Sequence, residues 1–119
     1  MSNKVLIVDD EEEICRSMQL LLSAFDIEAD YAFNHDEAIK QLSANSYKLV
    51  LSDIKMPGKD GIELVKSIRK QFGDQKVILM SGFSEYTLEE VKEMGVLDLY
   101  SKPLDMDSVL SNIQSILSH

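Results

Sequence analysis

Short apolar runs alternate with longer amphipathic segments along the whole chain, and this alternation limits the fold more than any other feature. Three of the runs are uninterrupted and rich in β-branched residues, as expected for strands that are covered on both faces. Two further runs are mixed with polar residues, which suits strands at the edges of a sheet. The uninterrupted runs are Val5–Val8, 49–51 and 77–80, and the mixed runs are 29–33 and 96–100.

The segments between the runs carry apolar residues at the spacing of three and four that marks one face of a helix. The fourth such segment is short, with only Leu88 and Val91 in the pattern. The last is well defined, and Asp105 stands where a helix N-cap would. The other predicted apolar faces are Ile14, Met18, Leu21, Leu22 and Phe25; Ala38, Ile39 and Leu42; Leu64, Val65, Ile68 and Phe72; and Met106, Val109, Leu110, Ile113 and Leu117.

Five strands that alternate with five helices predict an α/β fold with a parallel sheet and helices on both faces. A chain of 119 residues has the length of one domain, so we expect a single domain over 1–119. The expected strand order is 2-1-3-4-5, a doubly wound, flavodoxin-like sheet with its ligand crevice between strands 1 and 3. This order places the two mixed runs at the edges.

Charge and composition argue against several kinds of partner. The net charge of −9, with 12 scattered basic residues, argues against binding nucleic acid through its phosphates. No apolar run approaches the roughly 20 residues of a membrane span, and no signal-peptide pattern is present, so we expect a cytoplasmic protein without membrane contact. The single cysteine, Cys15, is expected to be a packed thiol in a reducing compartment rather than a nucleophile.

Polar and charged side chains follow the ends of four predicted strands. Because the carboxyl ends of parallel strands meet at one edge of the sheet, the three carboxylates among them should converge on the crevice. Each feature alone is ordinary, as a turn, a helix cap or a surface lysine, and only their joint placement points to a function. The residues are Asp9 and Asp10 after the first strand, Asp53 after the third, Ser81-Gly82 after the fourth and Lys102-Pro103 after the fifth.

Three converging carboxylates are unfavourable without a cation. Two carboxylates about 5 Å apart repel by roughly 3 kcal/mol at an effective dielectric constant near 20. A hard divalent cation relieves this repulsion, and carboxylates with a backbone carbonyl and waters suit Mg²⁺. Lys102 would add a positive charge and Ser81 a hydroxyl. A carboxylate nucleophile, a metal, an ammonium and a hydroxyl together predict phosphoryl transfer to an aspartate.

With these residues in place, the sequence resembles the receiver domains of two-component response regulators over nearly its whole length. The resemblance rests on Val8-Asp9-Asp10, on Asp-Ile-Lys-Met-Pro-Gly-Lys-Asp-Gly at 53–61, and on the pairs Ser81-Gly82 and Lys102-Pro103. The 53–61 segment is the most specific, because it combines an acceptor aspartate with the turn and the start of the next helix.

The resemblance implies a role for each acidic position. Asp53 matches the phosphoacceptor. Asp10 and Asp53, with the backbone carbonyl of Lys55, match the Mg²⁺ ligands, and Asp9 matches an acid that acts through a metal-bound water.

The resemblance also implies roles for the remaining positions. Ser81 matches a hydroxyl that moves toward the phosphoryl group, and Lys102 matches the lysine that pairs with it. The Lys102-Pro103 bond would be cis. Pro57, Gly61 and Pro103 match positions at which the backbone geometry is fixed.

In this family a histidine kinase or phosphotransfer protein supplies the phosphoryl group, as do small donors such as acetyl phosphate, and the same site then hydrolyses it slowly. The resemblance therefore implies a switch rather than an enzyme. Its output surface would be the fourth helix, fifth strand and fifth helix, which would bind a downstream protein not identified by the sequence. Phosphorylation-dependent dimerisation through that face, a stand-alone regulator and the receiver part of a longer protein are all compatible with the sequence.

Several positions depart from the family pattern or tune it. Leu99 stands where the family often has a switching Tyr or Phe, and Tyr100, one place later, should point to the other face of its strand. The segment from Ser81 to Gly95 is slightly short, so we expect a clipped or shifted fourth helix.

The Lys55 side chain and Phe83 are expected at the mouth of the site, where Phe83 would shield the phosphoryl group from water.

Other readings of the site fit less well. A haloacid-dehalogenase-type phosphatase normally has its nucleophile at the end of the first strand and a second Asp two residues later, where this chain has Lys55 after Asp53. A flavodoxin-like cofactor binder would need a phosphate loop where 9–13 is acidic, and no GxxxxGK[ST] pattern occurs. A pseudo-receiver that binds partners without phosphorylation is disfavoured by the complete set of site residues.

Overall fold

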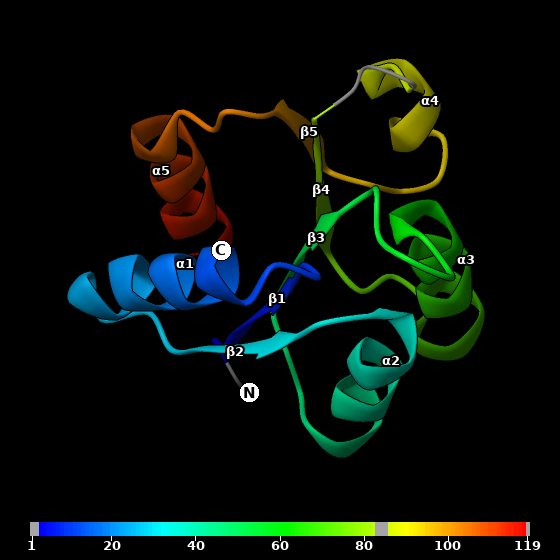
Figure 1. The fold of residues 1–119 in the computed structure, drawn as a ribbon, viewed down its shortest axis with the longest axis horizontal. Helices are drawn as coiled ribbons and strands as arrows, with labels where there is room; N and C mark the ends of the chain where they lie inside the picture. The colour runs from blue at the N-terminus through cyan, green and yellow to red at the C-terminus, as the bar shows by residue number, and fades with distance from the viewer. Residues whose placement is uncertain (1–2, 83–85, 119) are drawn as a thin grey trace.

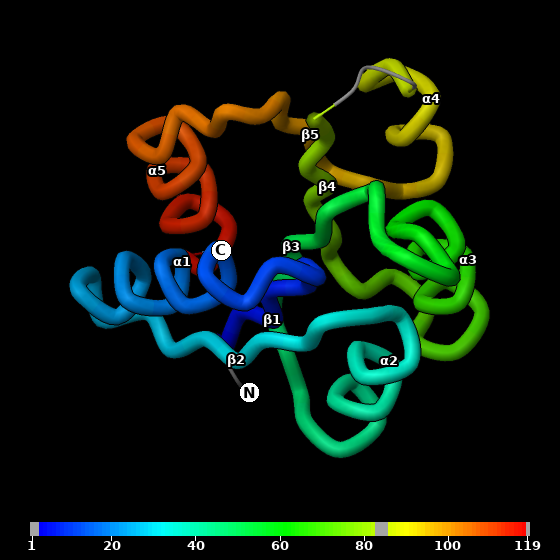
Figure 2. Tube along the Cα trace, viewed as in Figure 1, coloured from blue at the N-terminus to red at the C-terminus, as the bar shows by residue number. Residues whose placement is uncertain are grey.

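The computed structural model describes residues 3–82 and 86–118, which form a parallel sheet between two layers of helices (Figure 1). The strand order is β2-β1-β3-β4-β5, as predicted. Figure 2 shows the chain passing from β1 in the sheet to β2 at one edge, then returning to β3 on the other side of β1. The strands are β1 (Val5–Val8), β2 (Ala29–Ala32), β3 (Leu49–Asp53), β4 (Val77–Ser81) and β5 (Asp98–Ser101).

Two helices cover one face of the sheet and three cover the other. Helices α1 and α5 share a core cluster with Ile7 and Met80, whereas α2, α3 and α4 share another with Leu6 and Leu79 (Figure 1). The strands supply both clusters because successive side chains point to opposite faces. The helices are α1 (Glu12–Ala24), α2 (His35–Ala44), α3 (Gly61–Phe72), α4 (Leu88–Lys92) and α5 (Met106–Leu117).

The three uninterrupted apolar runs form the inner strands, and every residue of β1, β3 and β4 is buried. Burying one Val, Leu or Ile side chain contributes about 1.5–3 kcal/mol. Because both faces of these strands are covered, an apolar residue is favourable at every position, and this explains the lack of alternation. The edge strands β2 and β5 contain half-buried residues.

Strands β3 and β4 end at Asp53 and Ser81, and these two polar residues are paired within the sheet. The ends of two other elements differ from the sequence prediction. Strand β5 begins at Asp98, and Val96 is instead buried in the turn after α4. Phe25, predicted on the apolar face of the first helix, follows α1 and is 48% exposed.

Local capping supports the short helix α4 and the start of α5. The hydroxyl of Thr87 accepts a hydrogen bond from the backbone N–H of Glu90, whose side chain accepts one from the N–H of Thr87. This capping box favours a helix that would be too short to form in isolation. Asp105 is the N-cap of α5, as predicted, and accepts from the N–H of Ser108.

Leu99 and Tyr100 lie on opposite faces of β5, as the strand alternation predicts. Leu99 packs with the cluster of α2, α3 and α4, and Tyr100 with that of α1 and α5. The side-chain amide of Asn112, on α5, donates to the Tyr100 hydroxyl over 2.6 Å. Tyr100 is therefore tied to α5 rather than placed at the switch position.

A further tie joins the neighbouring helices α2 and α3. His35 is buried, its Nε2 lies 2.8 Å from the Ser67 hydroxyl, and its Nδ1 lies 2.9 Å from a carboxylate oxygen of Asp36. Both ring nitrogens thus have partners despite the burial.

A membrane span needs both length and high mean hydropathy, and none of the described helices combines the two.

Cys15 should be nearly inert in the folded protein. The thiol is buried, and burial together with the Asp9 carboxylate raises its pKa to about 11. At pH 8 only about one thiol in a thousand would then be a thiolate, which is the reactive form. We expect the native protein to react with Ellman's reagent at least about 100-fold more slowly than the protein in guanidinium chloride. Equal rates in the two conditions would contradict this placement.

Candidate functional site

Three carboxylates meet at the carboxyl edge of the sheet. Asp9 and Asp10 directly follow β1, and Asp53 is the last residue of the adjacent strand β3. Each offers a carboxylate oxygen, and these oxygens all lie within 4.8 Å of one another. Asp9 and Asp53 are buried, whereas Asp10 is exposed. The sequence prediction that these three acids converge is therefore correct.

Lys102 directly follows the edge strand β5, and its side chain reaches the same cluster. Its Nζ lies 3.2 Å from a carboxylate oxygen of Asp53 and 3.3 Å from one of Asp9. The N–H of Lys102 also donates to the carbonyl of Ser81 over 2.8 Å, which extends the pairing of β4 with β5 to the site. The Lys102-Pro103 peptide bond is cis, as predicted.

A pocket of about 300 Å³ opens onto this cluster. Asp53 lines this pocket, which offers a space that a small group can enter. Its lining residues are Asp10, Glu11, Asp53, Ile54, Lys55, Ser81, Gly82 and Lys102. Phe83, predicted at the mouth of the site, lies outside the described residues.

Burial and charge act in opposite directions on the central pair. Burial raises the pKa of the Asp53 carboxyl, and Asp9 adds to that rise, while Lys102 and the backbone N–H of Lys55 partly oppose it. For Lys102, burial acts to lower the pKa, but the charges of Asp53 and Asp9 outweigh it and the pKa lies above its usual value. The ammonium therefore stays charged and offsets part of the repulsion.

Hydrogen bonds from neighbouring residues hold Asp9 and Asp53 in place. Asp9 accepts a hydrogen bond from the N–H of Glu11 over 3.0 Å, and the Cys15 thiol donates to the Asp9 carbonyl over 3.4 Å. The hydroxyl of Ser52 donates to the carbonyl of Asp53 over 2.9 Å. Glu11 and Ser52 were not singled out in the sequence, although each directly adjoins a predicted site residue.

The turn from Asp53 to α3 leaves room for only a glycine at its end. The N–H of Gly61 donates to the carbonyl of Ile54 over 2.7 Å, and a Cβ at Gly61 would collide with the carbonyl of Asp53 and lie 2.7 Å from the Cα of Ile54. Pro57 is exposed in the same turn. Asp60 is the N-cap of α3 and accepts from the N–H of Glu63, which the spacing Asp60-x-x-Glu63 could have predicted.

The donor atoms of the cluster fit a hard divalent cation. All three acids supply carboxylate oxygens, and the exposed Asp10 leaves the cluster open to solvent. Oxygen ligands with room for waters are what Mg²⁺ prefers. A cation here would lie next to the pocket and offset the charge that Lys102 leaves uncompensated.

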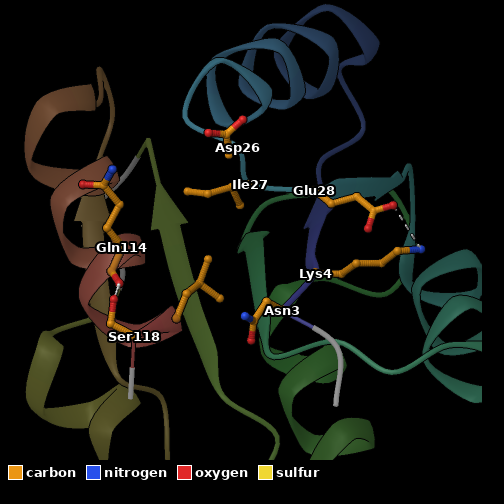
Figure 3. A pocket seen from close by; sticks show the side chains of 8 residues that line it. Asn3, Lys4, Asp26, Ile27, Glu28, Gln114 and Ser118 are labelled. Carbon is orange, nitrogen blue, oxygen red and sulfur yellow. Dashed lines mark hydrogen bonds and ion pairs between the residues drawn. The ribbon is translucent and has the colours of Figure 1, made fainter.

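A larger pocket, of about 610 Å³, lies at the amino ends of the strands (Figure 3). Lys4 and Glu28 on its wall form an ion pair of 4.0 Å. Asp26, Ile27 and Gln114 also line it, and none of the predicted site residues is among its lining residues. The volume of a pocket is therefore a poor guide to the site in this fold.

The sequence matches known proteins over nearly its whole length. Residues 5–114 match the family model of the response regulator receiver domain. Sporulation initiation phosphotransferase F of Bacillus subtilis (strain 168) is 31% identical over 118 residues, which cover 98% of this chain and 95% of that protein. Transcriptional regulatory protein ResD of the same strain is 36% identical over 96% of this chain and 48% of its own length.

Other relatives are much longer than this chain. Transcriptional regulatory protein ZraR of Salmonella typhimurium (strain LT2) is 31% identical over 97% of this chain, but only 26% of its own length is matched. The chain thus spans about a quarter of ZraR and about half of ResD.

Solved structures share the fold. The response regulator TrrA from Thermotoga maritima, solved in complex with Mg²⁺-BeF, has a TM-score of 0.86 and is 30% identical over 97% of this chain and 99% of its own. A two-component response regulator from Clostridium difficile has a TM-score of 0.90 and is 27% identical over 99% and 98% of the two chains.

Gly61→Ala should destabilise the protein by about 3 kcal/mol, because the added methyl group must displace the backbone at Asp53 and Ile54. Urea unfolding followed by circular dichroism measures the loss. Gly82→Ala is the matched control, since nothing lies within 4 Å of a Cβ built there. A loss no greater for Gly61→Ala than for this control would contradict the close approach.

Asp53→Asn should stabilise the metal-free protein at pH 7 by about 1 kcal/mol, because the buried site disfavours the ionised carboxyl and the amide carries no charge. A raised folded-state pKa means that the penalty is present at neutral pH and is lost as the pH falls through that pKa. The advantage of the variant should therefore shrink toward pH 4. Urea unfolding with a chelator between pH 4 and pH 8 tests this, with Asp74→Asn as an exposed control. A variant less stable than the wild type at pH 7 would contradict it.

Proposed function

This chain belongs to the response regulator receiver family and serves as a phosphoacceptor in two-component signalling, and on this premise we propose that Asp53 is the residue that takes the phosphoryl group. One observation carries the assignment. Asp53 is a buried carboxylate that faces the pocket, lies next to two further acids and stands 3.2 Å from the Lys102 ammonium. Asp9, by contrast, is not among the residues that line the pocket, and Asp10 is exposed.

We propose Mg²⁺ as the bound cation, with Asp10, Asp53 and the backbone carbonyl of Lys55 as its ligands and Asp9 acting through a water. The acidic cluster supports this set, as does the similarity to TrrA, which was solved with Mg²⁺-BeF. Bound there, the ion would neutralise negative charge on the transferring phosphoryl oxygens.

The proposed reaction is an in-line transfer from a phosphohistidine. A carboxylate oxygen of Asp53 attacks phosphorus, the new O–P bond forms as the N–P bond breaks, and the leaving imidazole keeps the electron pair and takes up a proton from water. Lys102 holds its ammonium beside the acceptor oxygen throughout, and the pocket leaves room for the group. Hydrolysis of the product by water at the same site resets the domain slowly, so it is proposed to act as a switch rather than as an enzyme.

Phosphorylation replaces a carboxylate by a group of greater negative charge, and Ser81 and Lys102 are proposed to respond to this change. Their different affinities for the two forms would shift the equilibrium between two forms of the surface made by α4, β5 and α5. Because the Tyr100 hydroxyl is hydrogen-bonded to Asn112, the shift is proposed to proceed without a rotation of an aromatic side chain. The downstream partner is proposed to be a protein.

The donor, a sensor histidine kinase or a phosphotransfer protein, is proposed to dock on an apolar groove beside the site. This groove of about 430 Å³ runs between α1 and the segment that precedes α5, and it shares Lys102 with the pocket. Its apolar lining comes from Ile14, Met18, Leu104 and Met106, together with Pro103. A partner that presents a phosphohistidine would there meet both an apolar surface and the proposed acceptor.

Intact-mass spectrometry after incubation with Mg²⁺ and acetyl phosphate tests the proposal. We expect the wild-type chain to gain the mass of one phosphoryl group, and the gain should disappear with a chelator or in Asp53→Asn. Asp74→Asn, which removes an exposed acid away from the pocket, should retain the gain and serves as the control.

The contrary outcomes are distinct. A gain that persists in Asp53→Asn would move the acceptor to another residue. No gain in the wild type, with beryllofluoride also without effect, would favour the pseudo-receiver.

A further inference from the structure

Arg69, on α3, donates hydrogen bonds to four backbone carbonyl oxygens in two separate segments. Two bonds from Nη1 go to the segment just after α3, to Gly73 over 2.9 Å and Gln75 over 2.7 Å. The others go to the segment just after α4, from Nε to Met94 over 2.9 Å and from Nη2 to Gly95 over 2.8 Å. The planar guanidinium thus joins the end of α4 to the end of α3.

The turn that ends α4 is built around this guanidinium. The N–H of Val96 donates to the carbonyl of Val91 and that of Gly95 to Lys92, with Gly95 at a φ of 84°, a pairing typical of a Schellman turn. A Cβ at Gly95 would lie 2.8 Å from Nε of Arg69. The cation also interacts favourably with the negative end of the helix dipole. The carboxyl end of α4 is therefore held by directional, charge-assisted bonds.

The amino end of α4 is held differently. In the part of the chain that the structure describes, its polar contacts are those of the capping box between Thr87 and Glu90, which lie within the same segment. Among the described residues before Val91, the half-buried Tyr86 packs against the core cluster of α2 and α3, and this contact is apolar. Apolar contacts tolerate small shifts better than hydrogen bonds do, so this end can move while the other stays in place.

The same stretch of chain begins at the phosphorylation site. Ser81 ends β4 and lines the pocket, and α4 is the next helix. Movement of Ser81 toward a phosphoryl group would therefore reach α4 at its amino end first. If the carboxyl end of α4 is fixed, a displacement of its amino end changes the direction of the helix axis.

We propose that Arg69 is a positioning residue that fixes the carboxyl end of α4, so that the change started at Ser81 by phosphorylation is confined to the amino end of that helix. The inference rests on the proposed function, since it assigns the fixed point of the same switch. Among the described residues, the hydrogen bonds of Arg69 go to the segments after α3 and α4, so its proposed effect on the switch is exerted through the end of α4.

Hydrogen–deuterium exchange with and without Mg²⁺ and beryllofluoride tests the inference. In the wild type, beryllofluoride should change exchange in 86–92 and leave 93–97 slow. In Arg69→Gln, exchange of 93–97 should be at least about tenfold faster without beryllofluoride, and the beryllofluoride-dependent change should extend into 93–97. Arg69→Lys keeps the charge but cannot reach both segments, so it should behave like Arg69→Gln and serves as the second variant if that one does not fold.

Two controls separate positioning from general destabilisation. Lys70→Gln removes an exposed charge beside Arg69 and should exchange like the wild type. Ile113→Val weakens the core on the opposite face and should lower the unfolding midpoint while keeping the wild-type pattern of beryllofluoride response. The inference is overturned if hydrogen exchange of 93–97 stays slow in both Arg69 variants. It is also overturned if the beryllofluoride-dependent change extends into 93–97 in Ile113→Val.

Failure of the proposed function would look different. Arg69→Gln should still gain one phosphoryl group from acetyl phosphate in the mass measurement, as the wild type does. If neither protein gains it, the phosphoacceptor assignment fails, whereas fast exchange of 93–97 in the metal-free variant would still establish Arg69 as the anchor of α4.

Discussion

The repulsion among three carboxylates at one edge of the sheet is the constraint on which the rest of the structure depends. Asp9, Asp10 and Asp53 meet because β1 and β3 are neighbours and end at the same level. Lys102 offsets part of the repulsion from two strands away, and its position requires β4 and β5 to follow in order. The strands are buried on both faces, so the core fixes the acids in an arrangement that none of them favours by itself.

This unfavourable arrangement is also what makes the site responsive. A crowded, partly buried set of acids is stabilised when a cation binds. It responds strongly when one of the acids receives a phosphoryl group, which carries a greater negative charge. The response can leave the site along the chain from Ser81 toward α4. That helix has only five residues, a capping box at one end and Arg69 at the other. A short helix with one strong anchor can change direction at low cost.

The sequence predicted the strand order and the convergence of the acids because both follow from local patterns. Continuous apolar runs mark buried strands, and residues just after such strands must lie at the carboxyl edge. Its errors were at the ends of elements, as with Phe25 and the start of β5. There, turn hydrogen bonds decide the boundary: the N–H groups of Phe25 and Ile27 donate to the carbonyl of Leu22, and the N–H of Leu97 donates to the carbonyl of Val77. The proposed role of Phe83 remains a prediction.

By itself the sequence determined the fold class, the strand order and the residues of the candidate site, because apolar periodicity and strand ends are local properties of the chain. Only the tertiary structure decided which acid is buried, which faces the pocket and how closely Lys102 approaches, since burial and distance depend on how the layers pack. The same holds for Arg69. In the sequence it is one basic residue on a helix, and its four carbonyl partners come together only when the ends of α3 and α4 meet in the fold.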